Sequence, residues 1–333
     1  MQIKSKVLNL AAAVALGAAS TAAMAKSVVV SAVGPLTDDY ALAVTWSNLL
    51  ANKGSELEMT VVENGTVGGI RKPAQGKVDV SIIGAPHYKD AVQHSGAFKD
   101  DPARLVSEYG NMRALFALQT AAAQYVFRTD SNVTSFYDLK GKDFSIGRPG
   151  GNGGRVTNVM LGAHGINMEA ETGGQYMKYG PALEQMANGN MHGAFVFGGI
   201  PHAAIDNASR NMEMRFVSPD PAKMEAFQKS ITNGEFYVLK HIPAEVIEKA
   251  YEGRVKANGD QYFWAFPFMF VVDKNMDDAT AYELTKTLWD NIAEVNKQSL
   301  ALSLVKRDVA LQGVSADIHP GAARYFKEVG LLK

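Results

Sequence analysis

Residues 27–83 read SVVVSAVGPLTDDYALAVTWSNLLANKGSELEMTVVENGTVGGIRKPAQGKVDVSII and indicate the fold class. Runs rich in β-branched residues alternate there with stretches of helical character, in the order 27–33, 40–52, 57–62, 66–75 and 78–83. Strands that alternate with helices predict a parallel sheet covered by helices. We therefore expect this stretch to form an α/β unit.

The chain beyond this stretch repeats the pattern. Two extended runs, at 113–118 and 124–127, come first, and the alternation restarts after Ser131 with strands at 144–147, 193–197 and 214–217 and helices at 153–164, 181–187 and 201–208. An extended aromatic run at 262–272 and helices at 278–298, 300–310 and 321–329 complete the chain. No long linker separates the units, so we expect a hinged pair of lobes: lobe I from residues 26–122 plus 236–333, and lobe II from residues 123–235.

The N-terminus has the features of an export signal. Lys4 and Lys6 precede an apolar stretch at 7–19, and Ala23-Met24-Ala25 provides a small-x-small cleavage pattern. The apolar stretch is shorter than the ~20 residues that span a bilayer. We expect residues 1–25 to be a signal peptide that is cleaved after Ala25, which leaves Lys26 as the first residue of the mature protein.

The composition favours a secreted protein without covalent crosslinks or an anchor. The chain has no cysteine, so it has neither a disulfide nor a thiol for a lipid. We infer a Gram-negative periplasm, because an unanchored solute-capturing protein would diffuse away from a cell without an outer membrane. Without Lys4 and Lys6 the chain has 31 basic and 34 acidic residues, a balance that does not favour nucleic acid or an anionic membrane as a partner.

Three glycine-rich loops each follow a predicted strand and precede a helix, at Asn64–Gly69, Gly147–Arg155 and Gly198–Pro201. Ligands of open α/β sheets bind beyond the carboxyl ends of the strands, where helix N-termini offer free N–H donors. Arg71, Arg148 and Arg155 lie in or beside two of the loops, and a guanidinium can bind a carboxylate through two hydrogen bonds. The pattern predicts a site for a small organic anion. The simpler alternative is that the glycines only make tight turns.

The sequence lacks the common signature motifs of nucleotide-binding proteins and enzymes. The chain has no G-x-G-x-x-G, P-loop, H-E-x-x-H or G-x-S-x-G motif, and its seven histidines lack metal-ligand spacing. We expect no cofactor, no metal and no catalytic residue. The candidate ligand-binding residues are Tyr40, Asn64, Gly65, Thr66, Gly68, Arg71, His87, Arg148, Gly150, Gly151, Asn152, Gly153, Gly154, Arg155, Gly198, Gly199, Pro201 and His202.

Several of these assignments leave alternatives open. Asp38 and Asp39 either cap the helix that begins near Tyr40 or contact a ligand, and Tyr40 either packs or lines the cleft. The aromatic stretch at 262–270 is either a buried strand with a proline irregularity or, in part, an apolar wall of the pocket. His87 and His202 follow strand ends closely, so they are the two histidines that we include among the candidate ligand-binding residues.

Four motifs together resemble the TAXI family, the substrate-binding proteins of one branch of the tripartite ATP-independent periplasmic (TRAP) transporters. They are Asp138-Leu139-Lys140-Gly141-Lys142, Gly147-x-Pro149-Gly150, Gly198-Gly199-Ile200-Pro201, and the segment from His319-Pro320-Gly321 to Gly330. The resemblance covers nearly the whole mature chain. It implies a two-lobed fold like that of the type II periplasmic binding proteins, with a hinge and a ligand cleft between the lobes.

The resemblance also implies a function: capture of a small carboxylate, amino-acid-like or dicarboxylate-like, and its delivery to an ion-driven TRAP permease. Glutamate recognition is not carried over, because the family's usual Gly-Ser-Gly-Thr run is replaced here at Gly151–Arg155, and Asp38 and Asp39 stand where the family tends to have aromatics. We expect a monomer that contacts its permease transiently and does not insert into the membrane. The alternatives are a periplasmic sensory subunit and an enzyme that acts on a small organic acid.

Overall fold

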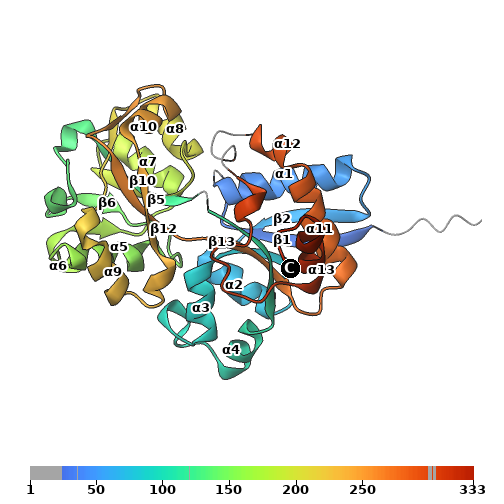
Figure 1. Ribbon diagram of the computed structural model, residues 1–333. Helices are drawn as coiled ribbons and strands as arrows, with labels where there is room; N and C mark the ends of the chain where they lie inside the picture. The colour runs from blue at the N-terminus through green and yellow to red at the C-terminus, as the bar shows by residue number, and fades with distance from the viewer. Residues whose placement is uncertain (1–24, 36, 120, 299–301, 303–304) are drawn as a thin grey trace, which may run out of the picture.

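The computed structural model describes residues 25–35, 37–119, 121–298, 302 and 305–333, which form two α/β lobes side by side (Figure 1). The predicted signal peptide lies outside the described residues except for Ala25. In the part of the chain that the structure describes, no helix has both the length and the apolar character needed to cross a membrane.

The first lobe is built on a five-stranded mixed sheet in the order β2–β1–β3–β13–β4. The strands are β1 Lys26–Ala32, β2 Leu57–Glu63, β3 Val80–Gly84, β4 Met112–Leu118 and β13 Phe268–Asp273. Strand β1 pairs in parallel with β2 and β3, as the alternating pattern predicts. Strand β13 comes from late in the chain and runs antiparallel to β3 and β4, so the sheet is mixed rather than wholly parallel.

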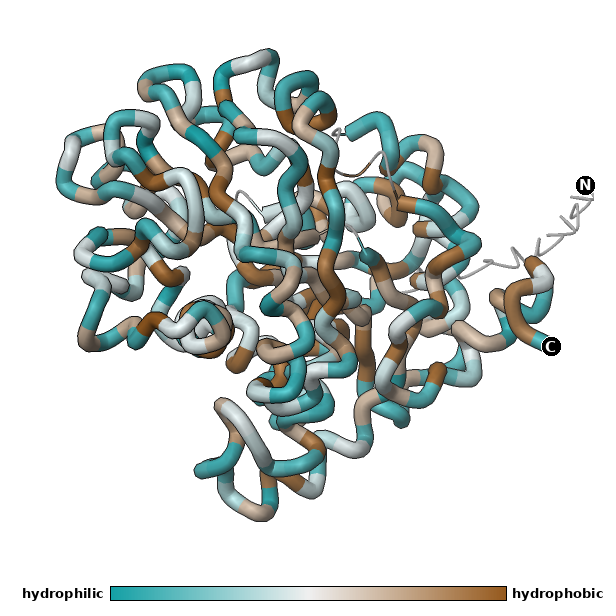
Figure 2. The backbone as a smooth tube through the Cα atoms, turned by 60° about the vertical axis from the view of Figure 1, so that its left-hand side comes forward, coloured by the Kyte–Doolittle hydropathy of each residue, from teal (hydrophilic) through white to brown (hydrophobic). Residues whose placement is uncertain are grey.

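Helices cover both faces of this sheet. They are α1 Asp38–Asn52, α2 Thr66–Ala74, α3 Ala85–Val92, α4 Ala103–Tyr109, α11 Asp278–Asp290, α12 Ile292–Asn296 and α13 Pro320–Glu328. One core contains Trp46, Phe116 and Trp289, and the other contains Ile83 and Tyr109. The hydropathy of the chain matches this layering, because hydrophobic stretches run through the interior and hydrophilic stretches lie mainly on the outer loops (Figure 2).

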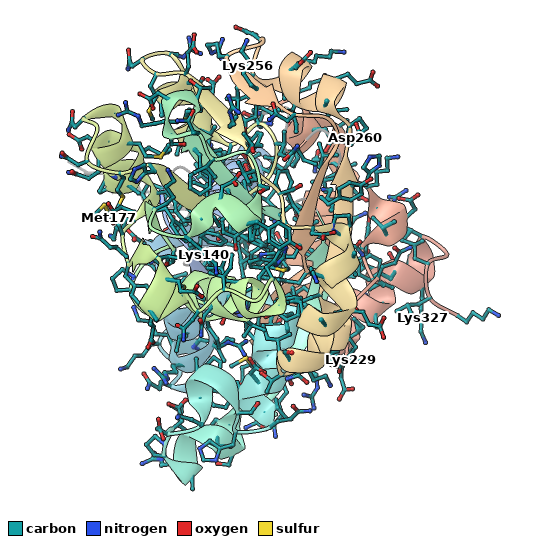
Figure 3. All side chains as sticks on the ribbon, turned by 90° about the vertical axis from the view of Figure 1, so that its left-hand side faces the viewer. Lys140, Met177, Lys229, Lys256, Asp260 and Lys327 are labelled. Carbon is teal, nitrogen blue, oxygen red and sulfur yellow. The ribbon has the colours of Figure 1, made fainter. Side chains whose placement is uncertain are left out.

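The second lobe has a six-stranded sheet in the order β11–β9–β5–β8–β6–β7 and a separate antiparallel pair, β10–β12. The strands are β5 Ala122–Arg128, β6 Asp143–Ser145, β7 Gly173–Gln175, β8 Gly193–Gly198, β9 Met214–Phe216, β10 Val238–Ile242, β11 Val255–Ala257 and β12 Gln261–Ala265. Its helices are α5 Gly153–Ala163, α6 Met168–Glu171, α7 Tyr179–Ala187, α8 Ala203–Ser209, α9 Met224–Ser230 and α10 Ala244–Ala250. Charged side chains such as Lys229 and Lys256 point outward from this lobe (Figure 3).

Two segments connect the lobes, one between β4 and β5 and one between β12 and β13. Strand β5 begins at Ala122, beside the first expected boundary. The chain was expected to return to the first lobe at residue 236, and this boundary needs correction. Strand β11 pairs with β9 and β10 pairs with β12, and all of these strands lie in the second lobe. We propose a second lobe boundary at Phe266–Pro267 instead.

The aromatic run at 262–272 is therefore not one strand but two strands in different lobes. Pro267 has no N–H for a sheet ladder, and the pairing stops there. Its carbonyl accepts a hydrogen bond from Ala85 N at 2.9 Å, which ties the crossing to the start of α3. The helix expected at 278–298 is divided into α11 and α12. The helix expected at 300–310 falls partly outside the described residues, and only a 3-10 turn at Arg307–Val309 is described there.

Candidate ligand-binding site

A cavity lies between the lobes and is lined by both. Its volume is about 60 Å³, which is room for several water molecules. The first lobe contributes Val33, Thr37, Asp38, Asp39, Leu42, Thr66, Ile82, His87, Leu118, Phe268, Phe270 and Leu302. The second lobe and the crossing segments contribute Ala121, Gly147, Arg148, Gly151, Asn152, Gly153, Tyr179, Phe195, Phe197, Gly198, Trp264 and Phe266.

The topology explains why these residues meet. Strands β1, β3, β6 and β8 end near the cavity. Val33 and Gly147 follow β1 and β6, His87 lies in the first turn of α3 after β3, and Gly198 is the last residue of β8. Because the carboxyl ends of parallel strands lie at one edge of a sheet, the loops after them gather at one place. Two such edges face each other across the lobe interface, as the strand-to-helix loops of the sequence predict.

An aromatic wall forms one side of the cavity; it consists of Phe195, Phe197, Trp264, Phe266 and Phe268. Phe197 stacks on Phe266 with ring centroids 4.7 Å apart, and Trp264 lies 5.9 Å from Phe266. Side chains alternate along a strand, so Trp264, Phe266 and Phe268 face the cavity while Phe263 packs into the other core of the second lobe. Both readings of the 262–270 stretch hold in part, since it is buried strand and cavity wall at once.

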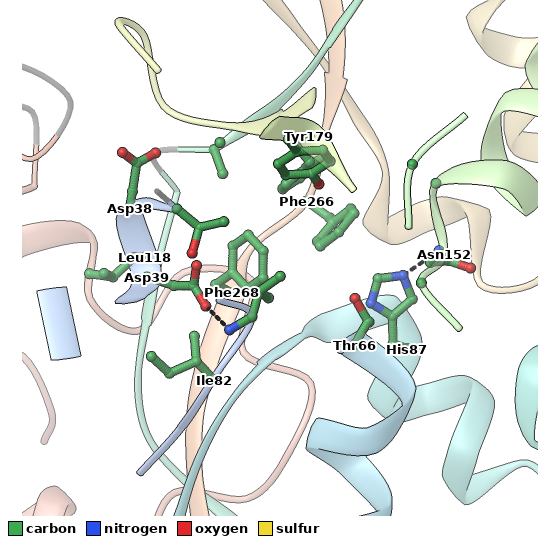
Figure 4. Close-up of a pocket in the computed structure, with 18 of the residues that line it drawn as sticks. Asp38, Asp39, Thr66, Ile82, His87, Leu118, Asn152, Tyr179, Phe266 and Phe268 are labelled. Carbon is green, nitrogen blue, oxygen red and sulfur yellow. Dashed lines mark hydrogen bonds between the residues drawn. The ribbon is translucent and has the colours of Figure 1, made fainter. Parts of the chain in front are cut away.

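One end of the cavity carries hydrogen-bond donors. Thr66 begins α2 and Asn152 precedes α5, and neither helix N-terminus has a side-chain cap. Asn152 Oδ1 accepts from Arg155 Nε at 2.8 Å, so its Nδ2 donates, to His87 Nε2 and to the Tyr237 hydroxyl. Figure 4 shows the His87 ring between Asn152 and Thr66.

His87 is a buried, neutral histidine in this arrangement. Burial, with a smaller contribution from the Arg155 guanidinium, lowers its pKa to about 3. Because Nε2 accepts from Asn152, the ring proton is assigned to Nδ1, and that atom is buried without a hydrogen-bond partner among the described residues. His87 therefore offers an unused N–H beside the cavity.

The opposite end of the cavity is acidic. Asp39 accepts from Val33 N at 2.7 Å within the first lobe, whereas Asp38 accepts from Gly199 N in the second lobe. Burial raises the pKa of both carboxyl groups, that of Asp38 to about 6, although the Gly199 hydrogen bond and the charge of Lys240 act against the shift in Asp38. Neither helix capping nor ligand contact alone describes the pair, because Asp38 joins the lobes.

Arg148 reaches across the cleft from the second lobe. Its Nη1 donates to Val33 O at 2.6 Å, and its Nη2 pairs with Glu63 at 3.1 Å. Lys178 shares the same Glu63 carboxylate at 3.2 Å. Arg148 Nε is buried and has no hydrogen-bond partner among the described residues, so one donor of the guanidinium remains unused near Gly65.

Arg155 makes a second connection between the lobes without lining the cavity. Its Nη2 lies 2.9 Å from Asp90 of α3, and Asn233 donates to the other oxygen of Asp90 at 2.7 Å. The Asp90 side chain is only 1% exposed. Arg155 also holds Asn152, so α3 and the start of α5 share one continuous network of hydrogen bonds.

Two of the expected ligand contacts are internal to the first lobe. Arg71 pairs with Asp101 at 2.6 Å and lies over the Phe98 ring. Asn64 donates to Ser31 at 2.9 Å and accepts from Lys72. Neither residue lines the cavity, so the guanidinium of Arg71 is a packing element rather than a clamp. Tyr40 packs against the core of the first lobe, and it too lies outside the lining.

Most of the expected residues of the third loop make contacts outside the cavity lining. His202 caps α8 by accepting from Ala204 N at 3.2 Å, and burial lowers its pKa to about 4. Pro201 follows a cis peptide bond, and Gly199 binds Asp38. Of this group only Gly198 lines the cavity.

The glycines of the other loops divide in the same way. Gly151 and Gly153 line the cavity, and a β-carbon on Gly153 would lie 2.6 Å from the Phe195 ring, so only glycine fits there. Gly150 has a φ of +70°, which shapes the turn. Gly65 and Gly68 of the first loop and Gly154 of the second loop were also expected at the site, but they do not line the cavity.

Sequence reasoning missed most of the apolar lining. Leu42, Ile82 and Leu118 read as ordinary core residues, and Phe195 and Phe197 as ordinary strand residues. Their type carries no signal, because a buried side chain beside a cavity resembles any other. The available signal was position: Phe197 and Leu118 are at or next to the end of a strand, where the loops gather.

Solved structures similar to this chain share little sequence with it. A TRAP periplasmic solute-binding protein from Ralstonia eutropha with bound (S)-2-acetolactate is 13% identical over 92% of both chains, with a TM-score of 0.45. A TRAP periplasmic solute-binding protein from Pseudomonas aeruginosa with bound L-malate is 12% identical over 92% of both chains, with a TM-score of 0.45. The periplasmic aliphatic sulphonate binding protein from Escherichia coli is 10% identical over 91% of this chain and 83% of that chain, with a TM-score of 0.42.

Sequence comparison at the level of families is more informative. The profile of the NMT1-like family matches residues 32–330, which includes both lobes and nearly all of the described chain. The match extends from the end of β1 to the C-terminal segment after α13. The chain belongs to the NMT1-like family.

Proposed function

We propose that this chain is an extracytoplasmic solute-binding protein that closes two lobes around a small organic anion and delivers it to a TRAP-type permease. The observation that carries the proposal is the cavity between the lobes, which is lined by both and enclosed by hydrogen bonds from one lobe to the other. A site that is complete only when two lobes meet binds its ligand by shifting the population from open to closed.

The donor end of the cavity supports an anion. The N-termini of α2 and α5 approach it from opposite lobes without side-chain caps, and each carries a partial positive charge. His87 Nδ1 and Arg148 Nε are buried N–H groups without partners among the described residues. A ligand carboxylate at this end would complete donors that the closed protein leaves unused. The proposal keeps Arg148 as a ligand contact and assigns Arg155 to lobe closure.

The resemblance to the TAXI family supports the transporter assignment and the export of the mature chain from Lys26 to the periplasm. We do not propose catalysis. His87 lines the cavity, but a base with a pKa of about 3 is mostly ineffective at neutral pH. Chemical turnover of a bound ligand would overturn this part of the proposal.

Tryptophan fluorescence tests the proposal directly, because Trp264 lines the cavity while Trp46 and Trp289 lie in the core of the first lobe. The mature protein is refolded to remove ligand and titrated with small carboxylates and amino acids, with small-angle scattering as the readout of closure. We expect one class of acid to change the fluorescence saturably and to compact the protein. Trp264→Phe is expected to lose the fluorescence change but keep the compaction.

Arg148→Gln is expected to weaken that binding at least tenfold, because it removes a charged donor from the cavity end. A protein that neither compacts nor gains thermal stability with any organic acid would contradict the proposed function.

A further inference from the structure

The charges around the cavity are unequal, and this restricts the ligand more narrowly than the proposed function does. Among the described lining residues, Arg148 is the one with a permanent positive charge, and it shares the Glu63 carboxylate with Lys178. His87 is neutral, whereas Asp38 and Asp39 are both acidic. Two cations that face one carboxylate leave room for one added negative charge at the donor end. At the other end the two aspartates outnumber the nearby Lys240, so a second negative charge is disfavoured there.

The arrangement of the lining separates the two ends. Figure 4 shows Asp38 and Asp39 on one side and Thr66, His87 and Asn152 on the other, with Phe266 and Phe268 between them. A ligand that spans the cavity with its carboxylate at the donor end must lay its middle against the aromatic wall. Its far end then lies near Leu118, Ile82 and the two aspartates. Apolar surface suits the wall and the two aliphatic side chains.

The acidic end is fixed by the fold rather than free to move away. Asp39 is held by Val33 N at the turn between β1 and α1, and Asp38 is held by Gly199 N of the opposite lobe when the cleft is closed. Burial raises the pKa of both carboxyl groups, but a pKa of about 6 leaves Asp38 ionised at neutral pH. A ligand carboxylate beside Asp38 would be a like charge in a site of low dielectric, where repulsion is stronger than in water.

We propose that the ligand is a monocarboxylate with an apolar body, and that Asp38 and Asp39 exclude dicarboxylates. This inference rests on the proposed function, and it narrows the expected range of amino-acid-like and dicarboxylate-like ligands. The one-carboxylate class includes zwitterionic amino acids with apolar side chains, because their ammonium group adds no negative charge.

Two acids of matched shape test this inference. In 4-methylpentanoate an isopropyl group stands where succinate has its second carboxylate, so the pair differs mainly in charge at one end. We expect 4-methylpentanoate to bind the wild-type protein at least tenfold more tightly than succinate, measured by calorimetry at neutral pH.

The variant Asp38→Asn is expected to reduce the ratio of the two affinities at least threefold. An amide oxygen still accepts from Gly199 N, and any effect on closure cancels in the ratio. Asp317→Asn is the control, because the Asp317 side chain is 85% exposed and does not line the cavity; it should leave the ratio unchanged.

The possible outcomes distinguish a failure of this inference from a failure of the proposed function. Succinate that binds as tightly as 4-methylpentanoate, or an unchanged ratio in Asp38→Asn, would overturn the exclusion of dicarboxylates while leaving a closing anion-binding protein intact. If neither acid nor any other organic acid closed the lobes, the proposed function would fail and the inference with it.

Discussion

Arg148 and Arg155 frame the same glycine-rich loop of the second lobe, yet they bind the first lobe in different surroundings. Arg148 meets Glu63, which is 36% exposed and shared with Lys178. Arg155 meets Asp90, which is 1% exposed and also held by Asn233. An ion pair at the rim is solvated and screened, whereas a buried carboxylate that loses its partners is left in a medium that cannot solvate it. We refer to these as the rim pair and the buried pair.

The comparison shows that a cationic residue beside a ligand loop need not bind the ligand. Both arginines have the position of an anion clamp in sequence, and both have an acidic partner in the opposite lobe, but Arg155 does not line the cavity. Both contacts join the two lobes, so under the proposed closure they would favour the closed form before any ligand contributes. Ligand affinity then also depends on residues outside the cavity lining, such as Arg155 and Asp90.

Removal of the buried carboxylate of Asp90 should have the largest effect on lobe closure and on apparent ligand affinity. We expect Asp90→Ala to weaken closure by about 3 kcal/mol, because Arg155 and Asn233 lose their shared partner. Apparent ligand affinity should then fall roughly a hundredfold, and scattering should show a more open protein.

Asp101→Ala is the matched control for that variant. Asp101 is also a largely buried acid paired with an arginine, but its partner Arg71 lies in the same lobe. It should lower thermal stability without opening the lobes. Equal effects of the two variants on closure would remove the distinction between pairs within and between lobes.

Low pH should reduce the stability of the protein mainly through buried groups near the buried pair. His87 shares α3 with Asp90, and its pKa of about 3 in the fold lies below the ordinary value of 6.5. Between these values the unfolded chain binds more protons, so stability is complete above pH 6.5 and falls as the pH drops. Through His87 alone we expect a loss of about 2 kcal/mol from pH 7 to pH 5.

Other groups titrate in the same range, so a variant is needed to isolate His87. The carboxyl of Asp38 has its pKa raised to about 6, and its stability contribution therefore grows as the pH falls through that value. The buried His202 acts in the same direction as His87. Denaturant unfolding of His87→Gln at pH 7 and pH 5 should show a loss smaller than that of the wild type by about 2 kcal/mol. Parallel pH profiles would show that His87 does not titrate as a buried group.

The rim pair should give the smallest effect. We expect Glu63→Gln to cost at most about 1 kcal/mol, or a fewfold change in apparent affinity, because the pair is partly solvated. At 1 M NaCl the difference between this variant and the wild type should nearly vanish, while the effect of Asp90→Ala should persist. A salt-insensitive loss in Glu63→Gln would make the two pairs equivalent.

The sequence predicts the lobes better than it predicts the site. The alternation over residues 27–83 is visible because β1, β2 and β3 are short β-branched runs in a local pattern. The sequence does not show that the chain passes back to the first lobe at Pro267. Strands β12 and β13 together look like one aromatic strand, and only their pairing partners distinguish them. The expected boundary at residue 236 failed for that reason.

The predicted residues that line the cavity are mostly those whose residue type reflects backbone geometry. Gly151, Gly153 and Gly198 line the cavity because glycine marks close approach, and Thr66, His87, Asn152 and Arg148 lie in or near the turns that follow strand ends. Arg71 and Arg155 were misleading, because a sequence does not show which acid reaches a guanidinium first. Asp101 is 30 residues from Arg71, and Asp90 is 65 from Arg155.

One segment has two roles: Trp264, Phe266 and Phe268 form the wall of the cavity, and the same chain passes from one lobe to the other at Pro267. If the lobes close as proposed, a mutation that adapts these rings to another ligand also alters a segment about which the lobes move. Natural selection therefore cannot tune ligand preference and the resting balance of open and closed forms separately at this point. Compensation must arise elsewhere, and Glu63 and the buried pair are sites where single substitutions would restore that balance without a direct contact to the ligand.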